Sequence, residues 1–149
     1  MTAAAAIIRS ALGLLRVVDA NEAPEAEDYA DGARALNAMM AAWAIDGWDL
    51  GWVAISSPDD VLASPVWADE ALIYNLAVRL RPHYGATLDP DVVAMARTGM
   101  ATISSYIARK VEEEKHPRVS YCDLPVGTGQ RLCGSCFKCG GECQCAPLP

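Results

Sequence analysis

The sequence predicts an all-α protein: a four-helix bundle followed by an extended, cysteine-rich C-terminal arm. Apolar residues make up 52% of the chain, with a single Phe among abundant Ala, Leu, Val and Met, and this composition favours helix over sheet. Apolar residues also recur at steps of three and four in four segments, the spacing of one helix face. This periodicity stops after Pro117.

The first helix is expected from about Thr2 to Val18, with Thr2 as its N-cap. The second follows the acidic linker of residues 19–25 and ends at Gly47, because glycine most easily takes the left-handed conformation that closes a helix. The expected core face of the second helix consists of Tyr29, Ala33, Leu36, Met40 and Trp43.

A loop of about 17 residues separates Gly47 from Ser64, and loops of this length are usually functional or mobile. Its first residues include Trp48 and Trp52. Large amphipathic rings outside a core are favoured at protein interfaces. We therefore predict that these two tryptophans lie on a surface that meets a partner, and the family resemblance given below implies that this partner is a neighbouring subunit.

The third helix is expected to start with Ser64 as its cap and Pro65 in its first turn, and to end at Pro82. Residues 71–80 are apolar on nearly every face, so this should be the central and most buried helix.

The fourth helix is expected to open at Asp89 and Pro90, a cap followed by proline, and to fade into residues 112–117. Its apolar face consists of Val93, Ala96, Met100, Ile103 and Ile107. Residues 1–115 are therefore predicted to form the bundle and residues 116–149 the arm, which has too little apolar surface to order itself alone.

The net charge of −7 is unevenly placed. Residues 1–70 carry 3 basic and 12 acidic groups, or −9, whereas residues 71–149 carry 9 and 7, or +2. An acidic front half repels DNA and anionic membranes. No segment approaches the roughly 20 apolar residues that span a bilayer. The alanine-rich start lacks leading basic residues and is interrupted by Arg9 and Arg16, so we expect no secretion signal and a cytoplasmic site of synthesis.

No pattern in the chain predicts an enzyme. Neither a Ser-His-Asp order, a phosphate loop nor an H-E-x-x-H motif is present. Asn75 and Arg79 lie one turn apart without a nearby nucleophile or base, which favours a structural polar pair. His83 and His116 each lie beside a proline at a helix end, where a solvent-facing role is usual.

Three segments, taken in order, resemble a known family. They are Leu36–Trp43 followed by Asp46–Gly47, Tyr74–Leu80 with Pro82–Tyr84, and Leu124–Gly129. Together they are similar to the head-to-tail adaptor of short-tailed phages, also called tail accessory factor or packaged-DNA stabilisation protein. The likeness covers residues 8–130 and rests on order and spacing.

The resemblance implies a four-helix body, copies of which form a twelve-fold ring under the portal protein. The ring would extend the DNA channel, let DNA pass without specific binding, and offer a platform to the next tail protein, a nozzle or hub. Such a protein is assembled in the host cytoplasm and resides in the virion. The arm would lie along portal subunits, and we expect its contacts to come from Arg118, Val119, Tyr121, Leu124, Pro125, Gly127 and Gln130.

The end of the chain departs from this pattern because it carries six cysteines: Cys122, Cys133, Cys136, Cys139, Cys143 and Cys145. Disulfides are favoured, since a virion leaves the reducing cytoplasm. One zinc ion on four of the sulfurs is the second reading. The C-x2-C-x2-C-x3-C spacing also matches an iron–sulfur run, although Gln144 replaces the usual proline. The adaptor requires no cofactor, and the alternative function is a small cytoplasmic metal-binding or iron–sulfur module.

Overall fold

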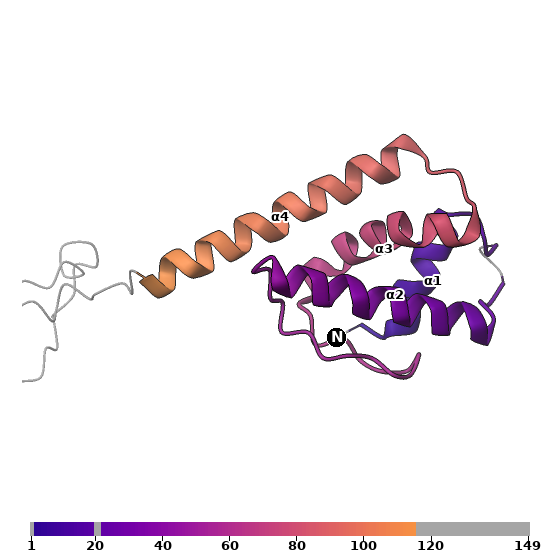
Figure 1. The fold of residues 1–149 in the computed structure, drawn as a ribbon, viewed down its shortest axis with the longest axis horizontal. Helices are drawn as coiled ribbons and strands as arrows, with labels where there is room; N and C mark the ends of the chain where they lie inside the picture. Colours follow the sequence, from indigo (N-terminus) through magenta and orange to yellow (C-terminus); the bar gives the residue numbers. More distant parts are fainter. Residues whose placement is uncertain (1, 20–21, 116–149) are drawn as a thin grey trace, which may run out of the picture. The chain divides into compact units, whose positions relative to one another are not determined.

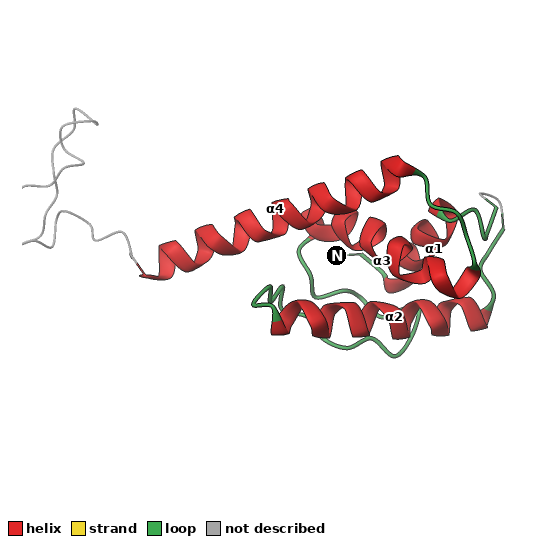
Figure 2. Cartoon of the chain, turned by 45° about the horizontal axis from the view of Figure 1, so that its top comes forward, coloured by secondary structure: helices red, strands yellow, loops and turns green. Residues whose placement is uncertain are grey.

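The computed structural model describes residues 2–19 and 22–115, and within these ranges the chain is helical (Figure 1). The described residues contain no β-strand, only an isolated antiparallel bridge between Ala3 and Val61. The all-α prediction is therefore confirmed for this part of the chain, as the coloured cartoon makes plain (Figure 2). The elements are α1 (Ala4–Leu14), α2 (Ala26–Ile45), the short 3₁₀ helix η1 (Val66–Ala68), α3 (Asp69–Tyr84) and α4 (Pro90–Lys115).

The chain divides after Ala108 into two units. The first contains α1, α2, η1, α3 and α4 as far as Ala108. Of the second unit, the structure describes Arg109–Lys115, an exposed helical segment. The predicted division into residues 1–115 and 116–149 stays a prediction.

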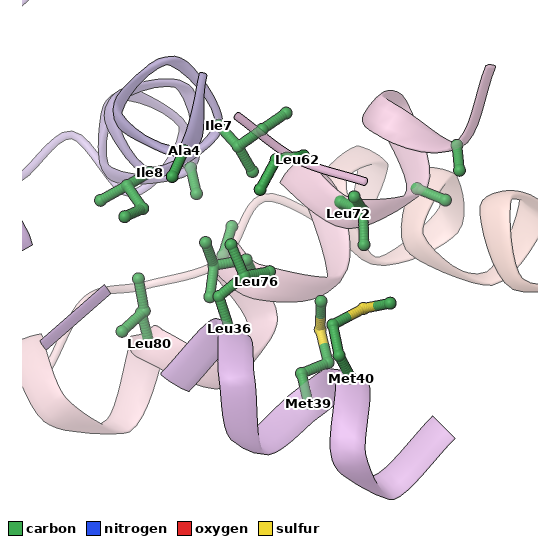
Figure 3. Close-up of a cluster of buried hydrophobic side chains, with 14 of the residues drawn as sticks. Ala4, Ile7, Ile8, Leu36, Met39, Met40, Leu62, Leu72, Leu76 and Leu80 are labelled. Atoms are coloured by element: carbon green, nitrogen blue, oxygen red, sulfur yellow. The ribbon is translucent and has the colours of Figure 1, made fainter. Parts of the chain in front are cut away.

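Side chains of α1, α2 and α3 pack together in one apolar core (Figure 3). Ile8 comes from α1, Leu36 from α2, and Leu72 and Leu76 from α3, and each is fully buried. Burying one such side chain contributes about 1.5–3 kcal/mol to folding. Helix α3 packs against both α1 and α2, so the prediction that it is the central helix is confirmed. The prediction that it is the most buried helix is wrong, because α1 buries five of its 11 residues and α3 five of its 16.

Helix α1 is shorter than predicted and is capped differently. Its N-cap is Ala3, without a side-chain hydrogen bond, so the prediction that Thr2 caps it is wrong. Instead, the N–H groups of Ala4 and Ala5 donate to backbone carbonyl oxygens of the long loop, each at 2.9 Å. The helix ends at Leu14 rather than Val18 because the chain turns into the left-handed region two residues later.

Arg16 makes this turn with a φ of 55°. Its N–H donates to the carbonyl of Gly13 at 3.0 Å, and the N–H of Val17 donates to that of Leu12 at 3.2 Å. These two bonds are those of a Schellman motif, which normally places glycine in the left-handed position. Gly47 occupies the corresponding position after α2, with a φ of 85°, and this confirms the predicted end of the second helix.

The third helix differs from prediction at both ends. The 3₁₀ turn η1 precedes α3, and Ser64 is buried with its Oγ unpaired within the described residues, so it does not cap the helix as predicted. Pro82 does not end α3, which continues to Tyr84 and closes at Gly85 with a φ of 59°. A proline in the last turn removes only one helical hydrogen bond. Side chains after Pro82 bind α2 and hold that turn in place, as described below.

Helix α4 approaches α3 closely at one point. A Cβ built on Gly99 would lie 2.7 Å from the Cβ of Ala71 and 2.8 Å from its Cα, so only glycine fits there. Nearby, Nδ2 of Asn75 donates to the carbonyl of Ala96 at 3.1 Å and to that of Ala71 at 2.8 Å. Asn75 therefore bridges the two helices through their backbones. Its hydrogen bonds do not go to Arg79, so the predicted polar pair of these two side chains is wrong.

Candidate interaction surface

The connection between α2 and α3 begins with residues 48–53, whose side chains alternate between the core and solvent. Trp48, Leu50 and Trp52 point inward: Leu50 is buried, and both tryptophans are half-buried against the hydrophobic core. Asp49 and Val53 point outward and are exposed. The tryptophans thus pack on their own chain, which the sequence analysis did not predict. Whether they also contact a neighbouring subunit stays a prediction.

Asn37 of α2 anchors this segment through three hydrogen bonds. Its Nδ2 donates to the carbonyl of Ile55 at 2.8 Å, and its Oδ1 accepts from the N–H of Ile55 at 3.0 Å. The same oxygen accepts from Nε1 of Trp52 at 3.2 Å. One helical side chain therefore satisfies both backbone groups of Ile55 and the polar atom of the indole ring.

Asp60 organises the next part of the connection. Its Oδ2 accepts from the N–H groups of Ser56 at 2.7 Å and Ser57 at 2.8 Å. These backbone hydrogen bonds stabilise the carboxylate and lower the pKa of Asp60 below its ordinary value. Its carbonyl in turn receives the N–H of Ala4. The long connection is therefore tied to both α1 and α2 along its length.

Exposed large apolar side chains concentrate on this connection. Val53 is 68% exposed, and Ile45, the last residue of α2, is 87% exposed. Trp67 is 42% exposed, and its ring lies 4.6 Å from that of Tyr106, centroid to centroid. Apolar groups held outward on an ordered segment are typical of surfaces that bind another protein. Five of the seven such side chains in the described residues fall between positions 45 and 67: Ile45, Val53, Val61, Val66 and Trp67.

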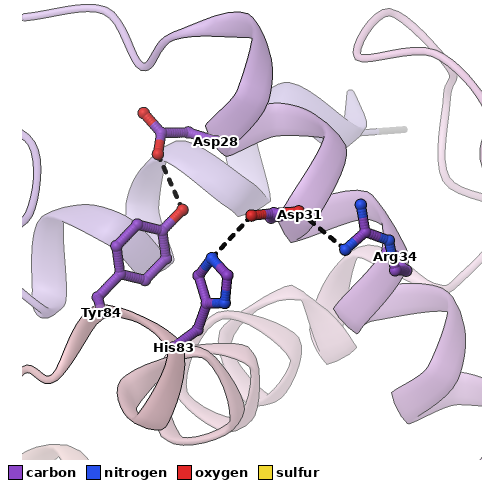
Figure 4. Close-up of polar contacts among 5 residues, drawn as sticks. All are labelled: Asp28, Asp31, Arg34, His83 and Tyr84. Atoms are coloured by element: carbon purple, nitrogen blue, oxygen red, sulfur yellow. Dashed lines mark hydrogen bonds and ion pairs between the residues drawn. The ribbon is translucent and has the colours of Figure 1, made fainter.

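A polar cluster joins the start of α2 to the end of α3 (Figure 4). The hydroxyl of Tyr84 donates to Asp28 at 2.8 Å, and Nε2 of His83 lies 2.8 Å from a carboxylate oxygen of Asp31. Asp31 also pairs with Arg34 at 2.9 Å. Burial, together with the hydrogen bond to Asp28 and its charge, raises the pKa of Tyr84. Since this cluster lacks a positioned nucleophile, its arrangement fits a clasp between helices and not a catalytic site.

Other candidate sites can be placed only in part. Within residues 2–19 and 22–115, no group of three or more His, Cys, Asp or Glu side chains could hold a metal ion. Among the helices of those same residues, none is long and apolar enough to cross a membrane. His116, the predicted portal contacts between Arg118 and Gln130, and all six cysteines lie outside the described residues.

A family model described as P22 tail accessory factor matches residues 7–136 of the chain. The chain belongs to this family. The resemblance found in the sequence is thereby confirmed, and the match includes both the compact helical unit and most of the predicted arm. No curated protein matches the chain. The P22 tail accessory factor family gives this protein a structural role in a phage tail, among other virion proteins.

The match ends at residue 136, inside the cysteine cluster. The family assignment therefore does not extend to Cys139, Cys143 and Cys145. Sequence reasoning singled out the tryptophans of the connection but missed the outward residues Asp49 and Val53. The alternation of apolar and polar residues from Trp48 to Trp52 was the signal that could have identified them, because it is typical of a segment with one face buried.

Proposed function

We propose that this member of the P22 tail accessory factor family is the head-to-tail adaptor of its phage. In this proposal, copies form a ring of twelve below the portal protein, extend the DNA channel and present a platform for the next tail protein. The family match over residues 7–136 is the observation that carries the proposal. The protein serves as a structural part of the virion and not as an enzyme.

The surface chemistry supports a channel component. Residues 1–70 carry a net −9. Phosphate-binding proteins gain affinity from clustered Lys and Arg, and an acidic wall does the reverse. DNA can therefore slide past such a ring without being held when the acidic residues of this half of the chain face the lumen.

The arm supplies the portal contact in this proposal. An extended segment can donate backbone groups and alternate side chains to a partner surface, and the free energy cost of ordering it is offset only in the complex. Fifteen residues reach roughly 50 Å when extended, enough to cross a neighbouring subunit. Tyr121, Leu124 and Pro125 are the apolar contacts that we expect to bury most surface.

Portal binding by the full chain tests the function. Purified protein mixed with the portal protein of the same virus should co-sediment with it, and native mass spectrometry should count one ring of copies per portal. Deleting residues 118–131 should abolish this binding while leaving the helical circular dichroism and the melting temperature unchanged. A matched control is truncation after Cys136, which removes the residues beyond the family match and should still bind. Portal binding by the 118–131 deletion at the wild-type level would contradict the proposed role of the arm.

A further inference from the structure

A small slot lies between the start of α3 and the middle of α4. The two helices run side by side (Figure 1), and they touch where Gly99 of α4 meets Ala71 of α3. These two residues line a hollow of about 70 Å³. Four larger side chains of η1, α3 and α4 also line it: Trp67, Glu70, Thr98 and Thr102. All four are exposed, so the slot is open to solvent at the surface of the compact unit.

Three polar side chains of the slot offer hydrogen-bond acceptors. The hydroxyl of Thr98 donates to the carbonyl of Ala94, and the hydroxyl of Thr102 donates to the carbonyl of Thr98, both at 3.1 Å. Each hydroxyl has a single proton, so only the lone pairs of the two oxygens remain for a ligand. The carboxylate of Glu70 is an acceptor as well. A ligand that satisfies these groups must therefore bring N–H donors.

The charge and the aromatic wall of the slot favour a cation. Glu70 forms no ion pair with another described residue. The ring of Trp67 lies 4.6 Å from that of Tyr106, centroid to centroid, and this contact holds the indole in place. The face of an indole ring attracts cations, and its N–H donor lies in the plane of the ring, where it does not compete for the face. A cation beside Trp67 and Glu70 would thus be attracted by both side chains.

Size and shape select the kind of cation. Ordinary sites for small molecules measure roughly 300–1,000 Å³, so a hollow of about 70 Å³ admits only the end of one side chain. A guanidinium group is planar and weakly hydrated, carries several N–H donors and stacks on aromatic rings. The ammonium group of lysine is a compact and strongly hydrated point charge. An arginine therefore fits the slot better than a lysine does.

We infer that the slot binds the guanidinium group of an arginine that a partner protein inserts between α3 and α4. Glu70, Thr98 and Thr102 accept its hydrogen bonds, and Trp67 packs against its plane. A charge-assisted contact of this kind gives direction as well as affinity, because the donors of the guanidinium group are fixed relative to one another. The inference goes beyond the proposed adaptor role and does not depend on the ring.

N-acetyl-arginine amide is the probe for an arginine within a protein, because it carries neither a free ammonium nor a free carboxylate group. NMR spectra of the isotope-labelled full chain in reductant record the backbone signals of Thr98 and Thr102 and the indole signal of Trp67 during a titration. These signals should shift and saturate in the millimolar range, since exposed ionic and cation–π contacts are each weak. N-acetyl-citrulline amide, which has the same shape without the charge, should cause no saturable shift. N-acetyl-lysine amide should bind more weakly than the arginine probe.

Two substitutions test the assigned acceptors at exposed positions, where the fold should be retained. Glu70→Gln removes the charge and should weaken binding of N-acetyl-arginine amide about tenfold or more, the usual effect of losing a charge-assisted hydrogen bond. Thr102→Val removes the hydroxyl oxygen at nearly constant shape and should weaken binding severalfold. Glu27→Gln is the matched control, because it makes the same change at an exposed position in the first turn of α2, outside the slot. It should bind the probe like the wild type, and the thermal melt of each variant checks its fold.

The remaining outcomes also decide. Equal binding of the citrulline and arginine probes would overturn the inference, since charge would then play no part, and so would wild-type affinity in Glu70→Gln. Equal binding of the lysine probe would overturn the assignment to arginine. Tighter binding of free L-arginine than of the capped probe would assign the slot to a free amino acid and remove the partner protein. No saturable shift at about 100 mM arginine probe would leave the slot without a ligand and overturn the inference. Portal binding is measured separately, so each of these outcomes leaves the test of the proposed function unchanged.

Discussion

Replacing Asn37 by Ala should release the connection from α2. The substitution removes three hydrogen bonds, to the carbonyl and N–H of Ile55 and to Nε1 of Trp52. Each contributes about 0.5–1.5 kcal/mol net, or roughly 1.5–4.5 kcal/mol together. Alanine regains about 0.5 kcal/mol of helix propensity, and water reaches some of the released groups because Asn37 is only half-buried. We therefore expect the free energy of unfolding to fall by about 2–3 kcal/mol.

For a domain of this size, such a loss lowers the melting temperature by roughly 8–12 °C. Thermal circular dichroism of the full chain measures this change, and tryptophan fluorescence reports whether Trp48 and Trp52 move into water. Arg34→Ala is the matched control on the same helix: the Arg34 side chain is 75% exposed, so its loss should cost no more than about 0.5 kcal/mol. A fall of less than about 2 °C for Asn37→Ala, with unchanged fluorescence, would refute the anchoring role, because three lost hydrogen bonds cannot cost so little.

Further predictions follow from the helix contacts and the cysteines. Gly99→Ala should lower the free energy of unfolding by about 1–3 kcal/mol, because the added methyl group overpacks against α3. Gly13 has open space around it, so Gly13→Ala should raise the free energy of unfolding by roughly 0.5–1 kcal/mol in the same denaturant titration. Arg16→Gly should stabilise the protein by about 1 kcal/mol, since it relieves a left-handed backbone, and an unchanged urea midpoint would argue against strain there. Because the pKa of Tyr84 is raised from its ordinary value of 10.0, first by burial and then by Asp28, the folded state holds the phenol proton more tightly than the unfolded state does. The resulting stabilisation is fully present below pH 10 and is lost as the pH rises above it. The melting temperature of Tyr84→Phe should therefore depend less on pH in the alkaline range than that of the wild type. An equal dependence in both proteins would exclude this account. Intact mass spectrometry of assembled particles should show the six cysteines either as disulfides, about 2 Da lighter per bond, or with one zinc ion bound. Six free thiols without metal would contradict the prediction that these cysteines cross-link the arm.

Local chemistry determined much of this protein without reference to tertiary contacts. The three-and-four spacing of apolar residues identified every α-helix of the described part, because that period puts the residues on one face whatever the helix later packs against. Gly47 marked the end of α2 for an equally local reason, since a left-handed residue carries little cost only in glycine. The order of such segments was also sufficient to indicate the family, which the match over residues 7–136 confirmed.

Helix ends were less predictable where distant groups could satisfy the backbone. Thr2 was expected to cap α1, but carbonyls near Asp60 receive the N–H groups there, and the hydroxyl of Thr2 donates to Asp69 instead. Pro82 was expected to end α3, but the bonds from His83 and Tyr84 to α2 keep these two further residues helical. The partners in each case lie dozens of residues away, so no local pattern reveals them.

The orientation of the connection was decided by tertiary structure alone. Two tryptophans in a loop predict an exposed contact surface, and this prediction uses only their amphipathic character. In the folded chain, Asn37 binds Ile55 and Trp52, which turns the tryptophan face inward and leaves Asp49 and Val53 outward. Residues 48–53 offer two alternate sets of side chains, and only the contacts with α2 select which set is buried. The sequence by itself determined the helices and the family, and the packing of α2 against the connection decided which side chains remain for a partner.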